Sequence, residues 1–476
     1  STGQGDDMPL KIPYYEMDIP RLVTALADWL ACLLYLRFLP PRYGGVKRAA
    51  LYGGALAALA LYLVATDGFN GWRFNVLYAV SVALMLLFMA AATRADRWQV
   101  GYFCTRAFIL AGFAGALTWQ MVVMWGIGAL LIYLAIVKKM EPSLLLPMGF
   151  GAILVNLPAS GAITQGDTVG PISALFEAGM SNELFPLLLF IGIGAMIDFG
   201  PLLEKPWLML FGAAAQFGIF FTLFLAGFFF DMKDAASIAV IGAADGPTAI
   251  FVANTLKSQY LGAIMVAAYS YMALVPIVQP PVIRLLTTQK ERRIRMPYEK
   301  GNVTQLTKIL FPVVVTVVAG LVAPASVALV GFLMFGNLLR ECGVLNSLSE
   351  TAQNVLANLI TLLLGLTVAG QMTADKFVRP DTLLIMALGL VAFIFDTAGG
   401  VLFAKLLNLF LPEGKKLNPM IGAAGISAFP MSGRVVNKMG LAEDSQNFLL
   451  MYSISVNVSG QIASVLAGGL ILSLMA

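Results

Sequence analysis

Long apolar runs separated by short polar stretches make up most of the chain. Most of them approach the ~20 residues that an α-helix needs to cross the hydrocarbon core of a bilayer. Backbone groups in lipid must be paired within the segment, so such runs predict helices. The pattern therefore predicts an all-α, polytopic membrane helix bundle, with runs near residues 21–39, 49–65, 74–93, 106–118, 122–137, 143–157, 184–199, 206–230, 235–256, 260–286, 307–323, 325–340, 354–371, 382–411, 418–438 and 446–475.

The clearest internal match is the tetrapeptide Ile-Gly-Ala-Ala, at residues 241–244 and 421–424, each time followed by Gly and Pro. It falls in the fifth run of two successive sets of runs, which predicts two structural repeats. Between the sets, Arg284 to Lys300 is rich in Lys and Arg, which predicts a cytoplasmic loop. The predicted parts are a polar N-terminal segment (1–20), an extra four-helix membrane module of unknown role (21–120), the first repeat (121–286), a basic cytoplasmic linker (287–306) and the second repeat (307–476).

Asp245 lies near the middle of the apolar stretch 235–253, directly before Gly246 and Pro247. A carboxylate at that depth is costly unless it is paired or hydrated, so it is a candidate functional residue. Gly and Pro both oppose helix, so we expect the helix to open at the acid and free carbonyls beside it. Interrupted helices at matching places in two halves are typical of a midplane ion site in transporters. The alternative is a proline kink with a structurally paired aspartate.

Composition supports the membrane setting and excludes several chemistries. Hydrophobic residues make up 59% and charged residues 12% of the 476 positions, against about 25% charged in soluble domains. The chain has no histidine, so histidine-based catalysis and histidine metal sites are absent. Cys32, Cys104 and Cys342 form no CxxC motif, and no Walker loop occurs. The net charge of +4 indicates no particular partner, and no nucleic acid is expected.

The second half supplies groups that can complete a cation site. Asn418 and Ser427 offer oxygen ligands, which suit a hard cation such as Na⁺. Arg434 carries a permanent charge suited to a carboxylate, either that of a substrate or that of Asp245; alternatively it snorkels at a helix end. Tyr271 can donate a proton or serve only as packing.

Asn457, an amide in the last helix, is a further candidate for binding Na⁺. Two acids are secondary candidates. Asp396 is a second intramembrane acid, and Asp198 lies nearer a helix end, where it can cap a helix or face water.

Five separated stretches resemble one family, in the family's order: residues 138–151 (KKMEPSLLLPMGFG), 192–203 (GIGAMIDFGPLL), 242–248 (GAADGPT), 271–281 (YMALVPIVQPP) and 418–434 (NPMIGAAGISAFPMSGR). The family is the β subunit of the biotin-dependent sodium-pumping decarboxylases, which act on oxaloacetate, methylmalonyl-CoA or glutaconyl-CoA. The resemblance covers about residues 121–476. Residues 1–120 match nothing in the family.

The resemblance implies decarboxylation of carboxybiotin coupled to Na⁺ export across a bacterial inner membrane. It implies an essential acid at Asp245 and a second polar stretch at Asn418, Gly422, Ser427 and Arg434, with Tyr271 and Asn457 as further site residues. Implied partners are biotinyl carrier and carboxyltransferase subunits and a small membrane-anchor subunit, in an oligomer. We expect Na⁺ at Asp245, Asn418 and Ser427, carboxybiotin near Arg434, and a proton returning through Asp245 or Tyr271.

A competing interpretation is a sodium- or proton-coupled secondary transporter of an organic anion, because broken helices and repeats fit it equally well. A sensory membrane protein would rest on residues 1–120 alone. Around Asn457 the sequence reads SVNVSG (455–460), whereas the oxaloacetate members of the family that this chain resembles read closer to GPNVAG. Within the resemblance, this difference favours the branch that acts on CoA esters. Topology is open, because Lys138 and the loop 284–300 fall on opposite sides unless one segment is re-entrant.

Overall fold

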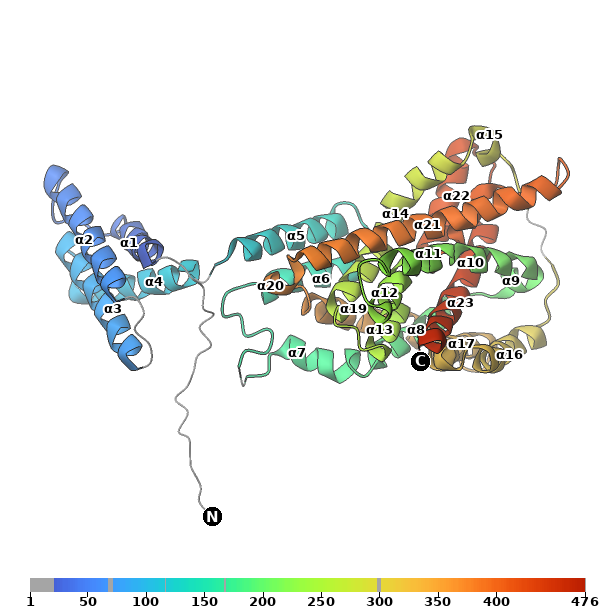
Figure 1. Ribbon diagram of the computed structural model, residues 1–476, viewed down its shortest axis with the longest axis horizontal. Coiled ribbons are helices and arrows are strands. Elements are labelled where there is room, and N and C mark those ends of the chain that lie inside the picture. The colour runs from blue at the N-terminus through green and yellow to red at the C-terminus, as the bar shows by residue number, and fades with distance from the viewer. Residues whose placement is uncertain (1–20, 67–71, 116, 167, 298–300, 476) are drawn as a thin grey trace, which may run out of the picture. The chain divides into compact units, whose positions relative to one another are not determined.

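The computed structural model describes residues 21–66, 72–115, 117–166, 168–297 and 301–475 (Figure 1). The polar segment predicted at residues 1–20 lies outside the described residues. Every regular element in the described ranges is a helix, apart from two isolated β-bridges, which confirms the all-α class. The chain divides into two compact units, one of residues 1–122 with 157–159 and one of residues 123–156 with 160–476.

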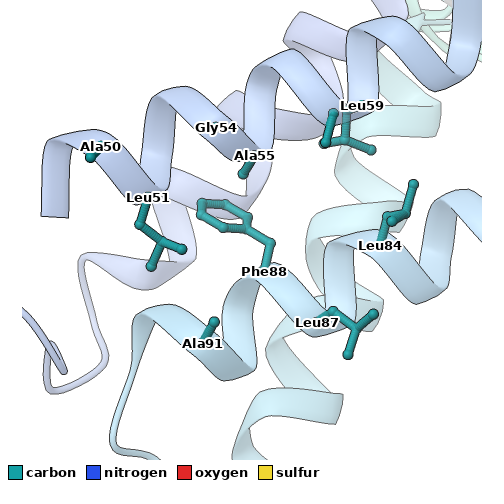
Figure 2. A pocket seen from close by; sticks show the side chains of 10 residues that line it. Ala50, Leu51, Gly54, Ala55, Leu59, Leu84, Leu87, Phe88 and Ala91 are labelled. Carbon is teal, nitrogen blue, oxygen red and sulfur yellow. The ribbon is translucent and has the colours of Figure 1, made fainter. Parts of the chain in front are cut away.

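Four helices build the first unit: α1 (Arg21–Leu36), α2 (Gly45–Ala65), α3 (Trp72–Ala92) and α4 (Arg97–Gly115). The fourth begins earlier than the predicted 106–118 and continues through Arg106. The unit has its own apolar core, which includes Leu59, Met85 and Met89. A hollow of about 360 Å³ lies between α2 and α3. Figure 2 shows the residues that line it, which are all apolar and include Phe88. None of the residues that line this hollow carries a polar or ionisable side chain.

The second unit contains the remaining helices. They are α5 (Trp119–Ile136), α6 (Pro142–Val155), α7 (Pro171–Leu175), α8 (Leu184–Met196), α9 (Gly200–Glu204), α10 (Met209–Ala215), α11 (Phe217–Ala226), α12 (Met232–Ala239), α13 (Gly246–Thr255), α14 (Leu261–Leu286), α15 (Gln289–Arg292), α16 (Gln305–Val322), α17 (Val327–Glu341), α18 (Asn346–Glu350), α19 (Ala357–Ala369), α20 (Ala374–Phe377), α21 (Pro380–Phe410), α22 (Met431–Glu443) and α23 (Leu450–Met475). Short 3₁₀ turns at Pro206–Leu208, Val240–Ala243, Pro324–Ser326 and Pro419–Gly425 and π-helical turns at Phe176–Met180 and Thr351–Leu356 complete it.

Eight helical segments of the described ranges are long and apolar enough to cross a membrane, and two of them, Pro206–Ala226 and Asn346–Ala369, consist of consecutive shorter elements. A ninth span is possible if the bent pair Pro171–Met180 and Leu184–Met196, which meet at 65°, counts as one. The chain is therefore a multi-pass membrane protein.

Three of the apolar runs are interrupted: the runs 235–256 and 418–438, where Gly and Pro predict a break, and the run 206–230, which was expected as one helix. The run 206–230 divides at Gln216, whose side-chain amide donates to Gly212 O (2.9 Å) and closes the end of α10. The run 235–256 passes through the 3₁₀ turn Val240–Ala243, and the run 418–438 through Pro419–Gly425, before each resumes as α-helix. The repeat relation between the two halves stays a prediction.

Helices of the second unit approach closely where glycines face a neighbour. An ideal Cβ on Gly194 of α8 would lie 1.8 Å from Leu333 O of α17, and one on Gly336 would lie 2.1 Å from Ile191 O. The same holds for Gly422, 2.0 Å from Gly400 O of α21. Apolar side chains gain little from leaving lipid, so close backbone approach at small residues is a main source of helix association in membranes.

Ion pairs connect the linker segment that follows α14 to residues of the second predicted repeat. Arg292 Nε donates to Glu443 (2.7 Å) and Arg295 Nε to Asp444 (2.6 Å), while Lys405 lies 3.1 Å from Glu291. We call these three pairs the linker clasp. The hydrogen bond from Arg292 is the main reason that the pKa of the Glu443 carboxyl lies below its usual value.

Candidate ion-binding site

Asp245 lies at the N-terminus of α13, where the preceding 3₁₀ turn ends. Ala244 adopts a left-handed conformation (φ 52°) and Asp245 an extended one (φ −119°), so the chain leaves the turn abruptly. Gly246 and Pro247 occupy the first helical positions, where the missing amide of Pro costs no helical hydrogen bond. The backbone amide of Thr248 then donates to Asp245 Oδ1 (3.4 Å), as in an N-cap.

The Asp245 carboxylate is buried and surrounded by neutral donors. Oδ2 accepts from Thr248 Oγ1 (2.7 Å), Ser464 Oγ (3.0 Å) and Gln461 Nε2 (3.3 Å). Its side chain is 3% exposed, and its partners in the described part of the chain include no lysine or arginine. A buried carboxylate without a cationic side chain is costly, so the site favours a bound cation or a proton.

The last helix, α23, supplies two of these donors because it packs closely on both interrupted segments. An ideal Cβ on Gly460 would lie 2.1 Å from Gly425 O, and one on Gly468 would lie 2.9 Å from Thr248 Cγ2. Asn457 Nδ2 donates to Ile426 O (2.6 Å), while its Oδ1 is buried and has no hydrogen-bond partner among the described residues.

The two interrupted segments contact each other. Ser427 N donates to Ala243 O (3.0 Å), two residues before Asp245, and Ser427 Oγ donates to Gly460 O (3.1 Å). The structure therefore brings Ser427 and Asn457 next to the segments that frame Asp245. Gly422 lies in the 3₁₀ turn Pro419–Gly425 that precedes Ser427, against Gly400 of α21.

Asn418 and Arg434 have other surroundings. Asn418 Nδ2 donates to Arg292 O and Ile294 O (both 2.9 Å), and its Oδ1 accepts from Met420 N (3.1 Å), so its bonds join the 3₁₀ turn to the linker. Arg434 is exposed on α22, and no side-chain partner is found for it among the described residues. Burial raises the pKa of Glu141, and Arg434 is close enough to oppose that rise.

Two tyrosines of α14 differ in the surroundings of their hydroxyl groups. Tyr271, the one expected in the site, donates its hydroxyl to Met386 O. Tyr269 is 1% exposed, and its hydroxyl has no partner in the described ranges. An ideal Cβ on Gly246 would lie 2.5 Å from the Tyr269 ring, so the ring lies directly against the start of α13.

The two secondary acids lie apart from these groups. Asp198 accepts from Gly200 N (2.8 Å) at the start of α9, is 45% exposed and lies 3.6 Å from Lys308 Nζ, so it caps a helix and faces a charge cluster. Asp396 of α21 is 1% exposed and accepts from Ile219 N (3.1 Å). The described residues contain no cluster of three or more His, Cys, Asp or Glu, so neutral oxygens would supply most ligands of a cation here.

Sequence reasoning missed four residues around Asp245: Thr248, Tyr269, Gln461 and Ser464. Thr248 had a local signal, because a hydroxyl three residues after an N-cap acid lies on the same helical turn. Gln461 and Ser464 also had one, since Asn457, Gly460, Gln461, Ser464 and Gly468 follow the spacing of one helix face. Nothing in the sequence pairs that face with Asp245.

Comparison with known proteins gives a consistent result. Residues 120–475 match the family model described as Na⁺-transporting oxaloacetate decarboxylase beta subunit. The oxaloacetate decarboxylase beta chain of Klebsiella pneumoniae is 44% identical over 405 residues, covering 73% of this chain and 93% of that protein. Methylmalonyl-CoA decarboxylase subunit beta of Propionigenium modestum is 45% identical (76% and 96% covered), and glutaconyl-CoA decarboxylase subunit beta of Acidaminococcus fermentans is 46% identical (76% and 94% covered). Identities this similar do not separate oxaloacetate from CoA esters as the substrate.

Proposed function

This chain belongs to the family of the Na⁺-transporting oxaloacetate decarboxylase beta subunit, and from that premise we propose how it couples carboxybiotin decarboxylation to sodium export. The observation that carries the proposal is the Asp245 carboxylate, which is buried among neutral hydroxyl and amide groups at the interrupted start of α13. The competing secondary transporter is set aside by the family match over residues 120–475.

Sodium, as the transported ion, binds at Asp245. The hydroxyl oxygens of Thr248 and Ser464 lie within hydrogen-bond distance of the carboxylate and are the first neutral ligands to consider. Further ligands lie on the adjoining segments. They are Asn457 Oδ1, for which the described part of the chain offers no hydrogen-bond partner, the Tyr269 hydroxyl and Ser427. Asn418 and Gly422 contribute to Na⁺ binding indirectly, because they hold the 3₁₀ turn Pro419–Gly425 in place.

Carboxybiotin is the substrate, and its carboxylate docks at Arg434. A guanidinium presents a planar fork that matches a carboxylate, and no ion pair is found for Arg434 among the described residues. Decarboxylation breaks the N–C bond, releases CO₂ and requires one proton on the ureido nitrogen. Coupling follows if Asp245 holds either Na⁺ or a proton, but not both. Each Na⁺ moved outward costs about 2.3 kcal/mol per 100 mV of membrane potential.

Beta subunits of these decarboxylases work in multi-subunit complexes. The partners proposed for this chain are a biotinyl carrier, a carboxyltransferase subunit and a small membrane-anchor subunit. The exposed position of Arg434 suits delivery of carboxybiotin by a carrier that is not part of this chain.

Asp245→Asn tests the proposal in the purified complex, whose biotinylated subunit is detected with streptavidin and which is then placed in vesicles. The variant keeps size and hydrogen bonding but cannot exchange a proton for Na⁺. We expect normal assembly with loss of both decarboxylation and Na⁺ uptake, since one site serves both. Asp198→Asn, in a half-exposed charge cluster, is the matched control and should keep both. Decarboxylation at a normal rate without Na⁺ uptake would show that chemistry and transport use separate groups.

A further inference from the structure

A second buried carboxyl lies on α21, outside the group around Asp245. Asp396 is 1% exposed, and its Oδ1 accepts from Ile219 N (3.1 Å) at the start of α11. Its other oxygen, Oδ2, is buried without a hydrogen-bond partner in the described part of the chain. One oxygen of Asp396 is therefore explained by helix capping, and the other is not.

Two glycines make room for this carboxyl. An ideal Cβ on Gly218 would lie 2.5 Å from Asp396 Oδ1, and one on Gly242 would lie 2.8 Å from Oδ2. Gly242 belongs to the 3₁₀ turn Val240–Ala243, three residues before Asp245. The unexplained oxygen thus faces the backbone segment that leads into the sodium site.

No charged side chain neutralises Asp396 in the described ranges. Among the elements packed against α21, α10, α11 and the turns Val240–Ala243 and Pro419–Gly425 contain no ionisable residue. The ionisable residues on the other elements packed against α21, and on α21 itself, are Lys233 and Asp234 of α12, Tyr269, Tyr271 and Arg284 of α14, Asp375 and Lys376 of α20, and Asp381 and Lys405 of α21. Asp234 bonds to Ser258 and Gln259, Lys405 to Leu286 O and Glu291, and Tyr271 to Met386 O, so none of these three compensates Asp396.

The surroundings of Oδ2 favour a proton over a metal ion. Sodium needs several oxygen ligands around it, whereas the group shown beside Oδ2 is Gly242, which carries no side-chain oxygen. A serine or asparagine would accept the Ile219 amide equally well, so capping does not require an acid. What only an acid adds here is the ability to hold and release a proton.

We propose that Asp396 is a proton relay that reloads Asp245 after Na⁺ has left. The proton leaves Asp396 Oδ2, crosses by intervening water along the Val240–Ala243 turn and joins the Asp245 carboxylate; Asp396 then takes a proton from water. This inference rests on the sodium site proposed at Asp245. A proton relay would affect only one of two processes. Exchange of Na⁺ for Na⁺ at Asp245 needs no proton, whereas net turnover coupled to decarboxylation does.

The test compares these two processes in vesicles that hold the complete complex. In Asp396→Asn and Asp396→Ser, which both keep an acceptor for Ile219 N, exchange of labelled Na⁺ should stay within about twofold of the wild type, while decarboxylation-coupled uptake should fall at least about tenfold, the loss expected when a positioned proton donor is removed. Lowering the pH should recover part of the coupled rate. Asp381→Asn, an exposed acid on the same helix, is the control and should change neither.

Each other outcome overturns the inference. Coupled uptake at the wild-type rate, or equal losses of exchange and coupled uptake, would make Asp396 a structural residue, as would failure of both variants to assemble. A failure of the sodium site itself looks different, because Asp245→Asn would then retain Na⁺ exchange whatever the Asp396 variants do.

Discussion

Tyr269 and Tyr271 lie two positions apart on α14, and their hydroxyls have opposite situations. The Tyr271 hydroxyl bonds to Met386 O, while the Tyr269 hydroxyl is buried beside the start of α13 with no hydrogen-bond partner in the ranges that the structure describes. Tyr271→Phe should therefore cost about 1 kcal/mol of stability, a typical value for one hydrogen bond. Tyr269→Phe should leave stability unchanged but raise the Na⁺ concentration for half-maximal activity at least about fivefold, since about 1 kcal/mol of ligand interaction is lost.

Thermal unfolding and Na⁺ titration of the two complexes separate these effects. The reverse pattern, with Na⁺ affinity sensitive only to Tyr271→Phe, would return Tyr271 to the site and remove Tyr269 from it.

Arg434 is exposed, and its proposed role depends on the shape of its side chain as well as on its charge. Lysine keeps the charge but cannot form two parallel bonds to a carboxylate. Arg434→Lys should therefore lower the rate of carboxybiotin decarboxylation about tenfold or more, with little change in Na⁺ affinity. Lys438→Arg, one turn along the same exposed face, provides the control. Wild-type turnover in Arg434→Lys would exclude the bidentate contact.

The sequence predicted Asp245 as a functional residue because an acid followed by Gly and Pro in an apolar run has few purely structural explanations. It could not point to Gln461 and Ser464 as partners of that acid, since they lie more than 200 positions away and reach it only through the packing of α23. Asn418 shows the opposite difficulty. Its residue type suits a cation ligand, yet its amide is committed to two carbonyls of the linker.

At the scale of elements, the two 3₁₀ turns depend on backbones that nearly touch their neighbours. Gly422 of the turn Pro419–Gly425 leaves no room for a side chain, because an ideal Cβ would lie 2.0 Å from Gly400 O of α21. Gly422→Ala should destabilise the complex by about 1–3 kcal/mol, the usual range for overpacking, and impair Na⁺ binding in parallel. Gly126→Ala on α5, where nothing lies within 4 Å, should be neutral in the same thermal assay. Equal stability of the two variants would mean that the turn can shift without cost.

Helix existence was largely predictable, whereas helix interruption was predictable only where the sequence contains a helix breaker. Gly246-Pro247 and Pro430 are helix breakers and predict the interruptions in the runs 235–256 and 418–438. The division at Gln216 had no such signal, because glutamine is a good helix former and the break depends on its amide reaching Gly212 O and, at 3.5 Å, Gly425 O of a distant segment. Tertiary contacts decided that boundary.

At the scale of the whole molecule, the family match and the residues of the proposed sodium site share one part of the chain. The match covers residues 120–475, and every contact described around Asp245 falls inside the second compact unit. The first unit keeps an apolar core of its own. Its membrane character was predictable from the apolar runs, but its role was not, since its residues form no pattern with known chemistry.

The linker clasp has a consequence for how the two halves of the pump domain are joined. Arg292, Arg295 and Glu291 already bond to residues beyond position 400, and Asn418 and Asn447 both hold Arg292 O. The peptide chain between residues 297 and 301 is then not the only connection across the linker. Two co-expressed polypeptides, residues 1–297 and 298–476, should reassemble into an active pump that purifies through a tag on either fragment. Arg292→Ala with Arg295→Ala should be tolerated in the continuous chain yet prevent the fragments from associating.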